Sequence, residues 1–156
     1  MVADYASTIM LDFTNTGNPT SGIASIWKAI EMWSATINAE SLCIGKAYAN
    51  DTLQKIAWYA HAVHGLSITG SSTAPARHRY CITHDANSKT ATLYYKRNND
   101  TVQTVTVTTT NFVTTQASVK FGANANDQTS LPAGTVNNAK IYNRVLSQSE
   151  IDAFFA

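Results

Sequence analysis

The chain has 156 residues and a net charge of +1, with 44% hydrophobic and 13% charged residues. A chain of this length buries a hydrophobic core without disulfide or metal support, so we expect one domain over residues 1–156. The near-neutral charge does not attract nucleic acid or an anionic membrane, and no apolar run is long enough to span a bilayer. We therefore predict neither a nucleic-acid partner nor membrane insertion.

Short apolar or alternating runs recur along the chain, and clusters of turn-forming residues separate them. Runs rich in Thr, Val, Ile and Tyr are typical of β-strands. Ten segments fit this pattern, namely Ser7–Phe13, Ile26–Ile37, Ser41–Gly45, Gln54–Ala62, Gly65–Thr69, Arg79–His84, Thr90–Lys96, Val102–Thr108, Ala117–Ala123 and Thr135–Asn143. Their number and spacing predict an all-β fold, an antiparallel β-sandwich of the jelly-roll type.

The clearest local unit is a hairpin in the middle of the chain, where the strands at 79–84 and 90–96 flank the turn Asp85–Ser88. Cys43 and Cys81 each lie inside a predicted strand. Because the N-terminus lacks the basic start and apolar run of a secretory signal, we expect two buried free thiols more than a disulfide. Their pairing stays open.

The Thr-rich run from Val102 to Thr115 contains no charged residue. Its β-branched side chains favour a strand. The run predicts either a solvated sheet face or a sheet edge that pairs with another subunit. The second alternative is open because the run has no charged side chain that would prevent such pairing.

A short helix closes the chain. Ser147 and Glu150 have the spacing of a capping box, in which each side chain satisfies the backbone N–H of the other residue. Leu146 and Ile151 flank this cap as a hydrophobic staple, so we predict a helix that begins at Gln148.

This C-terminal segment resembles the closing motif of laminin-G-like domains in the concanavalin A-like lectin/glucanase superfamily, which reads G-x-I-D-D-V-R-I-Y-N-R-x-L-S-x-x-E-I. Asn137 and Asn138 replace the acidic pair of the motif, and Lys140 replaces its arginine. The residues that match the motif or a close relative of it are Gly134, Val136, Ile141, Tyr142, Asn143, Arg144, Leu146, Ser147, Glu150 and Ile151. The resemblance implies a concanavalin A-like β-sandwich with a short C-terminal helix.

The resemblance also bears on activity. Catalytic glucanases of the superfamily carry E-x-D-x-x-E on one strand, which places two carboxylates about 5 Å apart for retaining hydrolysis. The three glutamates of this chain, Glu31, Glu40 and Glu150, do not have that spacing. We therefore predict that the protein is not an enzyme.

A binding surface would combine aromatic rings, which stack on sugar rings, with polar groups that bind hydroxyls. Aromatic and histidine side chains that alternate away from apolar neighbours, and Asn or Asp residues in predicted turns, fit this description. The candidate ligand-binding residues are Tyr59, His61, Asp85, Tyr94, Asn124, Asn126, Asp127 and Tyr142.

No cofactor is predicted, although the loop from Gly122 to Ser130 leaves calcium open because its Asn and Asp side chains offer oxygen ligands. Against calcium, Asp127 is the sole carboxylate of that loop. His61 and His64 are three residues apart, so on a strand they point to opposite faces, and we predict no metal site there.

We expect a non-catalytic binding module. The first hypothesis is an accessory protein on the surface of a bacteriophage particle, which contacts a neighbouring virion protein, binds glycans and leaves the cell by lysis. The alternative is a free-standing lectin or a carbohydrate-binding module excised from a larger secreted protein. A homo-oligomer is compatible with both hypotheses.

Overall fold

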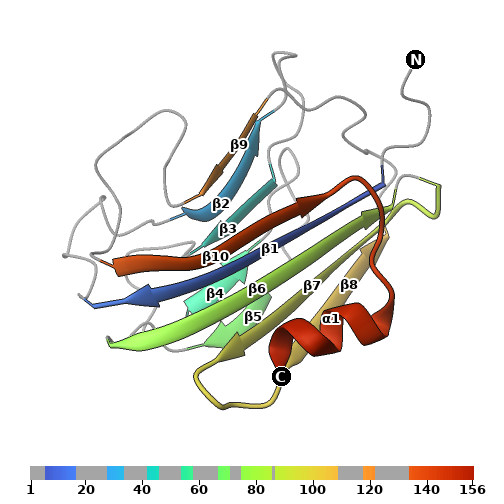
Figure 1. Ribbon diagram of the computed structural model, residues 1–156. Helices are drawn as coiled ribbons and strands as arrows, with labels where there is room; N and C mark the ends of the chain where they lie inside the picture. The colour runs from blue at the N-terminus through green and yellow to red at the C-terminus, as the bar shows by residue number, and fades with distance from the viewer. Residues whose placement is uncertain are drawn as a thin grey trace.

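A computed structural model of the protein describes residues 6–16, 28–33, 42–45, 54–57, 67–70, 75–85, 87–108, 118–121 and 134–156. These ranges contain one helix and ten strands (Figure 1). For β2 to β5 and for β9, the description covers the backbone. The elements are β1 Ala6–Asn15, β2 Lys28–Trp33, β3 Leu42–Gly45, β4 Gln54–Ala57, β5 Ser67–Gly70, β6 Ala76–Asp85, β7 Thr90–Arg97, β8 Gln103–Thr108, β9 Ser118–Phe121, β10 Gly134–Tyr142 and α1 Gln148–Phe155.

The strands form three antiparallel sheets. The largest has five strands in the order β10-β1-β6-β7-β8, and the others have the orders β3-β2-β9 and β4-β5. Figure 1 shows the two smaller sheets behind the five-stranded sheet, with α1 on its other side. We call the side that α1 covers the outer face, and the side toward the smaller sheets the inner face. This layering is a β-sandwich.

The strand predictions are confirmed, because each of the ten predicted segments overlaps an observed strand. Where the predicted bounds near β2 and β4 extend further, the extra residues lie outside the described ranges. The predicted helix is also confirmed, since α1 begins at Gln148.

Across β1, β6 and β7, the inner face of the five-stranded sheet is mostly apolar and buried. Register pairs Ile9 with Ile82 and Ile82 with Leu93, so these side chains form one row across three strands. Their exposed fractions are 0%, 2% and 0%. Burial of such large aliphatic side chains contributes about 1.5–3 kcal/mol each. This row is the centre of the core.

A second row on the inner face is aromatic. Tyr80 and Tyr95 pair directly, with ring centroids 5.2 Å apart. Nδ1 of His78 lies 2.9 Å from the hydroxyl oxygen of Tyr95, which is hydrogen-bonding distance. Burial, together with the charge of Arg97, lowers the pKa of His78 to about 4. The imidazole is therefore neutral at pH 7.

The outer face buries a separate apolar cluster beneath α1. Met10 of β1 and Cys81 of β6 pack there against Leu146, Ile151 and Phe155. Cys81 is a free, buried thiol, and burial raises its pKa to about 12. The prediction of a buried free thiol is thus confirmed for Cys81, whereas the side chain of Cys43 lies outside the described residues.

Two features tie the C-terminal segment to β1. The hydroxyl of Thr8 donates to the carbonyl of Arg144 at 2.8 Å and accepts from the N–H of Leu146 at 3.0 Å, so it holds the turn that leads into α1. At the start of β10, a methyl group on Gly134 would overlap the Phe13 ring and the carbonyl oxygen of Thr14. Glycine is required there because the backbones approach closely.

The capping box at the start of α1 is confirmed. The Ser147 hydroxyl accepts from the N–H of Glu150 at 3.4 Å, and the Glu150 carboxylate accepts from the N–H of Ser147 at 2.9 Å. Hydrogen bonds from Arg144 and Ser147 lower the pKa of Glu150 to about 2. The helix is short, so its position depends on this cap and on the cluster beneath it.

We predict that Ser147→Ala lowers the free energy of unfolding by about 1 kcal/mol, because an N-cap hydroxyl is lost. Urea denaturation would measure the change. Ser149→Ala is the matched control, since it deletes the same hydroxyl two residues later and leaves both capping-box bonds in place. Equal effects of the two substitutions would contradict a capping role.

We also predict that stability decreases as the pH falls from 6.5 to about 4, the pKa of His78 in the folded state. The unfolded chain binds a proton on this imidazole in that range and the folded protein does not, so unfolding becomes easier by at most about 3 kcal/mol. Urea midpoints at successive pH values would measure the slope. His78→Gln should flatten it, and an unchanged slope in that variant would disprove the assignment.

Candidate functional site

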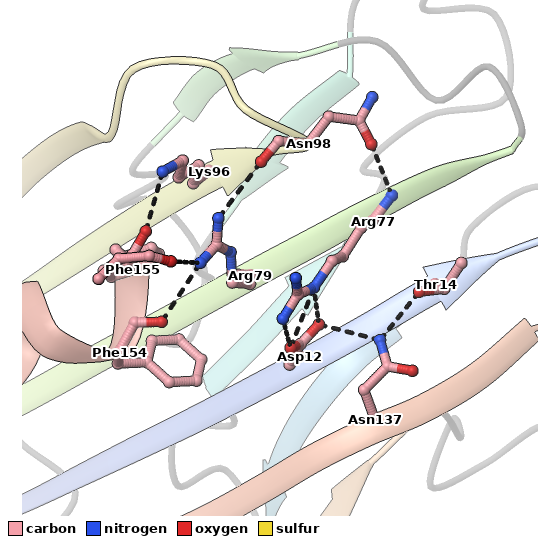
Figure 2. Close-up of polar contacts among 10 residues, drawn as sticks. Asp12, Thr14, Arg77, Arg79, Lys96, Asn98, Asn137, Phe154 and Phe155 are labelled. Carbon is pink, nitrogen blue, oxygen red and sulfur yellow. Dashed lines mark hydrogen bonds and ion pairs between the residues drawn. The ribbon is translucent and has the colours of Figure 1, made fainter.

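The outer face carries a polar cluster next to the C-terminal end of α1, which we call the Arg77 cluster. It brings together side chains from β1, β6, β10 and the β7–β8 turn (Figure 2). Its members are Asp12, Thr14, Arg77, Asn98 and Asn137.

An ion pair between Arg77 and Asp12 forms the centre of the cluster. Nε of Arg77 donates to both carboxylate oxygens at 2.9 and 3.1 Å, and Nη2 donates to Oδ2 at 2.5 Å. Register places Arg77 opposite Thr14 and therefore diagonal to Asp12 across the β1–β6 ladder. Such diagonal neighbours are within reach of a long side chain. The guanidinium is thus held in one orientation.

Asn137 joins the cluster because β10 has a bulge at this point. Asp12 pairs with Asn138 and Phe13 pairs with Val136, which leaves Asn137 as the extra residue. Its Nδ2 donates to Oδ1 of Asp12 at 3.0 Å and to Oγ1 of Thr14 at 2.8 Å. The bulge directs this side chain toward β1, a common use of bulges.

The two charged groups of the ion pair differ in exposure. The Asp12 side chain is 7% exposed and the Arg77 side chain is 51% exposed. Burial opposes ionisation of Asp12, but hydrogen bonds from Arg77 and Asn137 and the charges of Arg77 and Arg79 lower its pKa below 3.8 overall. Asp12 is therefore an ionised anchor for the half-exposed side chain of Arg77.

Two further cations border the cluster and hold the end of α1. Arg79 donates from Nη1 to the main-chain oxygens of Phe154 at 3.4 Å and Ala156 at 2.8 Å, and Lys96 donates to that of Phe155 at 2.8 Å. These oxygens have no partner within a helix, and cations are favoured at this end of the helix dipole. Figure 2 shows both side chains between β6, β7 and the helix end. Their role is structural.

The cluster can bind a polar ligand but lacks a pair of catalytic groups. Among the described residues, none accepts a hydrogen bond from Nη1 of Arg77. The cluster holds one carboxylate, Asp12, which is already paired, whereas glycoside hydrolysis normally needs two. No three His, Cys, Asp or Glu side chains in the described ranges could together hold a metal ion. No helix in those ranges is long and apolar enough to cross a membrane.

Five of the predicted ligand-binding residues lie outside the described residues. Two of them fall between β4 and β5 in the sequence, and three fall between β9 and β10. They are Tyr59, His61, Asn124, Asn126 and Asp127. The loop from 122 to 130, for which the sequence leaves calcium open, also lies outside the described residues. The ligand-binding role of the five residues and calcium binding by the loop therefore stay predictions.

Tyr94 and Tyr142 both pack against the cluster beneath α1, which differs from the expected open surface. The Tyr94 hydroxyl donates to Oε1 of Gln148 at 3.4 Å, and its ring lies beside Phe155 with centroids 6.5 Å apart. The sequence predicts an exposed face for these tyrosines, but they are half-buried because α1 folds back over this side of the sheet. Their contact with a ligand stays a prediction.

Asp85 lies apart from both groups, at the hairpin turn. Its carboxylate accepts from the N–H of Asn87 at 3.0 Å and from the hydroxyl of Ser88 at 2.9 Å. Hydrogen bonds from Ser88 and Asn87 lower its pKa despite a smaller opposing effect of burial. Asp is common in turns because its side chain bonds the backbone two residues ahead. A turn-forming role accounts for these contacts, and ligand binding by Asp85 stays a prediction.

The central members of the Arg77 cluster were not among the sequence candidates. One signal was present, because Arg77 and Arg79 alternate with buried residues at the start of β6 and therefore share a face. Asp12 gave a second signal as a carboxylate inside an apolar strand. The bulge that recruits Asn137 has no evident sequence signal.

No protein-family model and no curated protein sequence matches the chain. Among solved structures, it is similar to the CBM40 domain of the Ruminococcus gnavus IT-sialidase bound to α2,6 sialyllactose. The TM-score is 0.61 at 14% identity, over 99% of this chain and 85% of that one. The NanB sialidase from Streptococcus pneumoniae matches with a TM-score of 0.65 at 13% identity. That match covers 96% of this chain and 24% of the sialidase, so this chain spans about a quarter of it.

A third similar structure is the catalytic domain of a glycoside hydrolase family 131 protein from Coprinopsis cinerea. It has a TM-score of 0.52 at 16% identity, over 94% of this chain and 60% of that one. At such identities the likeness concerns the fold alone. The chain has a jelly-roll β-sandwich fold. The fold class predicted from the sequence is confirmed.

We predict that Asp12→Asn destabilises the protein near neutral pH, because Arg77 loses its charged partner. A carboxylate with a lowered folded-state pKa stabilises the protein above its ordinary value and loses that effect as pH falls below 3.8. The difference in urea midpoint between wild type and variant should therefore shrink between about pH 5 and about pH 2. Asp100→Asn, in an exposed turn, is the control and should shift the midpoint less at pH 7. A difference that does not change with pH would contradict the paired carboxylate.

Proposed function

We propose that this domain is a non-catalytic glycan-binding module. The observation that carries the proposal is its similarity in fold, over nearly the whole chain, to a CBM40 domain bound to sialyllactose. A second structure of that domain, bound to α2,3 sialyllactose, covers 97% of this chain with a TM-score of 0.63. A β-sandwich supplies a rigid framework on which a binding surface is built, and the surface itself decides the ligand.

We propose the Arg77 cluster as the contact for the acidic group of such a glycan. A guanidinium recognises a carboxylate with two parallel hydrogen bonds. When another group of the protein holds the guanidinium, its orientation is fixed before the ligand binds. Asp12 holds Arg77 by its Nε and Nη2 atoms, and no described residue accepts a hydrogen bond from Nη1. The carboxamide oxygen of exposed Asn137 adds an acceptor for a sugar hydroxyl.

The absence of catalysis is part of the same proposal. The single, paired carboxylate of the cluster supports a binding role. The similar structures include a sialidase and a glycoside hydrolase domain, so turnover belongs in the assay. Release of sialic acid or reducing sugar by the purified protein would overturn this part of the proposal.

We predict that the protein binds sialyllactose more tightly than lactose and that Arg77→Gln weakens sialyllactose binding about 10- to 100-fold, the value of one charge-assisted contact. Isothermal titration calorimetry would measure both affinities. Lys89→Gln removes one positive charge from an exposed residue of the hairpin turn, so it is the matched control and should bind like wild type. Arg77→Lys keeps the positive charge but loses the planar guanidinium that can bind a carboxylate with two hydrogen bonds. This variant should therefore bind sialyllactose nearly as weakly as Arg77→Gln.

Each alternative result has a defined meaning. If glycans bind but Arg77→Gln has no effect, the site lies elsewhere, and Tyr59→Ala and Asp127→Ala test the residues selected from the sequence. If neither sialylated nor neutral glycans bind, the module proposal fails. A circular dichroism melt of each variant separates loss of binding from loss of fold.

The setting of the module is a separate proposal. We favour an accessory protein on a bacteriophage particle, supported by the low charge and the many hydroxyl and amide side chains, which suit packing against a neighbouring protein. The alternative is a lectin or a module from a larger secreted protein. Antibody labelling of purified particles would separate the two. The laminin-G-like assignment remains a prediction from the C-terminal motif.

A further inference from the structure

The exposed hydrophobic side chains of the described residues gather at one edge of the five-stranded sheet. Val136 and Ile141 lie on β10, and Val145 follows it in the turn before α1. Their exposed fractions are 46%, 53% and 38%, and no other large hydrophobic side chain is exposed among those whose burial the structure describes. Single exposed hydrophobic residues are normal on a protein surface, whereas a group in one place marks an interaction surface.

Among the described residues, the same strand has one edge without a paired strand. Within the part of the chain that the structure describes, β10 is the outermost strand of its sheet, and β1 is its one hydrogen-bonded neighbour. Figure 1 shows it along the border of the sheet. An edge strand presents a row of main-chain N–H and C=O groups that are ready to pair with another strand. Strand β10 has nine residues, which is long for an edge.

The apolar side chains of β10 share the inner face. Register pairs Val136 with Phe13, Ala139 with Leu11 and Ile141 with Ile9, and these three partners are buried in the core. The row Val136, Ala139 and Ile141 therefore continues the core to the border of the sheet, where no further strand covers it among the described residues. Another strand beside β10 would place side chains along the open flank of this row and reduce its contact with water.

We propose that β10 is a homodimer interface, in which two copies of this chain join their five-stranded sheets edge to edge through antiparallel β10 strands. A two-fold axis perpendicular to the sheet gives antiparallel pairing and keeps the inner faces of both copies on the same side. The apolar row of each copy then lies beside that of the other. The result is one continuous sheet.

The charge pattern supports a second copy as the partner. Lys140 is the one charged residue of β10. In one antiparallel register, Lys140 of one copy pairs with Lys140 of the other copy. In every other register each lysine lies opposite an uncharged residue, so like charges are not paired. The bulge at Asn137 restricts the registers that fit, as bulges do in sheets. A two-fold contact uses both β10 edges, so assembly stops at the dimer.

The opposite edge of the sheet is a weaker candidate. Among the side chains of β8 that the structure describes, no large hydrophobic one is exposed, and the strand contacts β5 of the neighbouring layer. The sequence expectation that an uncharged Thr-rich edge pairs with another subunit concerns this strand. The two edges therefore make competing predictions that one experiment can separate.

We predict a dimer with a Kd in the micromolar range, because a strand pair is smaller than the standard interface of about 1,600 Å². Light scattering of the full chain from about 1 µM to about 1 mM would measure the mass against concentration. Ile141→Lys places a charge in the apolar row and should raise the Kd at least about tenfold. Thr104→Lys adds the same charge at an exposed position of β8 and should leave the Kd unchanged.

Other outcomes overturn the proposal. A monomer throughout the concentration range, a trimer, or a dimer that Thr104→Lys disrupts and Ile141→Lys spares would each do so. Val136→Lys is the second variant if Ile141→Lys does not fold by circular dichroism. Hydrogen exchange locates the contact directly, because amides of β10 should exchange more slowly at high than at low concentration while those of β8 do not change.

Discussion

The packing of α1 against the outer face of the five-stranded sheet is the contact on which the rest of the described structure depends. It buries Met10 and Cys81 on the side of the sheet away from the main core, so β6 is covered on both faces along most of its length. A sheet packed on both faces is held more rigidly than one with a solvated face, because each side chain has neighbours on both sides. Thr8 fixes the turn before the helix, while Arg79 and Lys96 hold its end.

This arrangement also creates the candidate site. The helix covers one part of the outer face, and the Arg77 cluster lies beyond its C-terminal end (Figure 2), where the Arg77 side chain is half-exposed. A half-exposed guanidinium that is held by a buried carboxylate has a defined direction without an added entropy cost on binding. If the two copies pair through β10, two such clusters lie on one side of a continuous sheet, and a surface that carries several glycans would bind with avidity.

Much of the fold could be predicted because its signals are local. Alternation identified all ten strands, and the Ser147 and Glu150 pair located the start of α1. The site was harder to predict because it depends on which strands become neighbours. Asp12 and Arg77 are 65 residues apart, and Asp12 and Asn137 are 125 residues apart. Alternation indicated an exposed face for Tyr94 and Tyr142, because it could not show that the helix would pack over them.

The sequence by itself determined the elements: strands where β-branched and aromatic residues alternate, turns where Asn, Asp and Gly interrupt them, and a helix after a capping box. These choices depend on interactions between residues a few positions apart. The tertiary structure alone decided the strand order, the side of the sheet that α1 covers and the partners of Arg77. Those features depend on contacts between distant segments, and a short alternating strand can satisfy its hydrogen bonds beside many others. The register and the bulge of β10 select one arrangement and bring Asp12, Arg77 and Asn137 together.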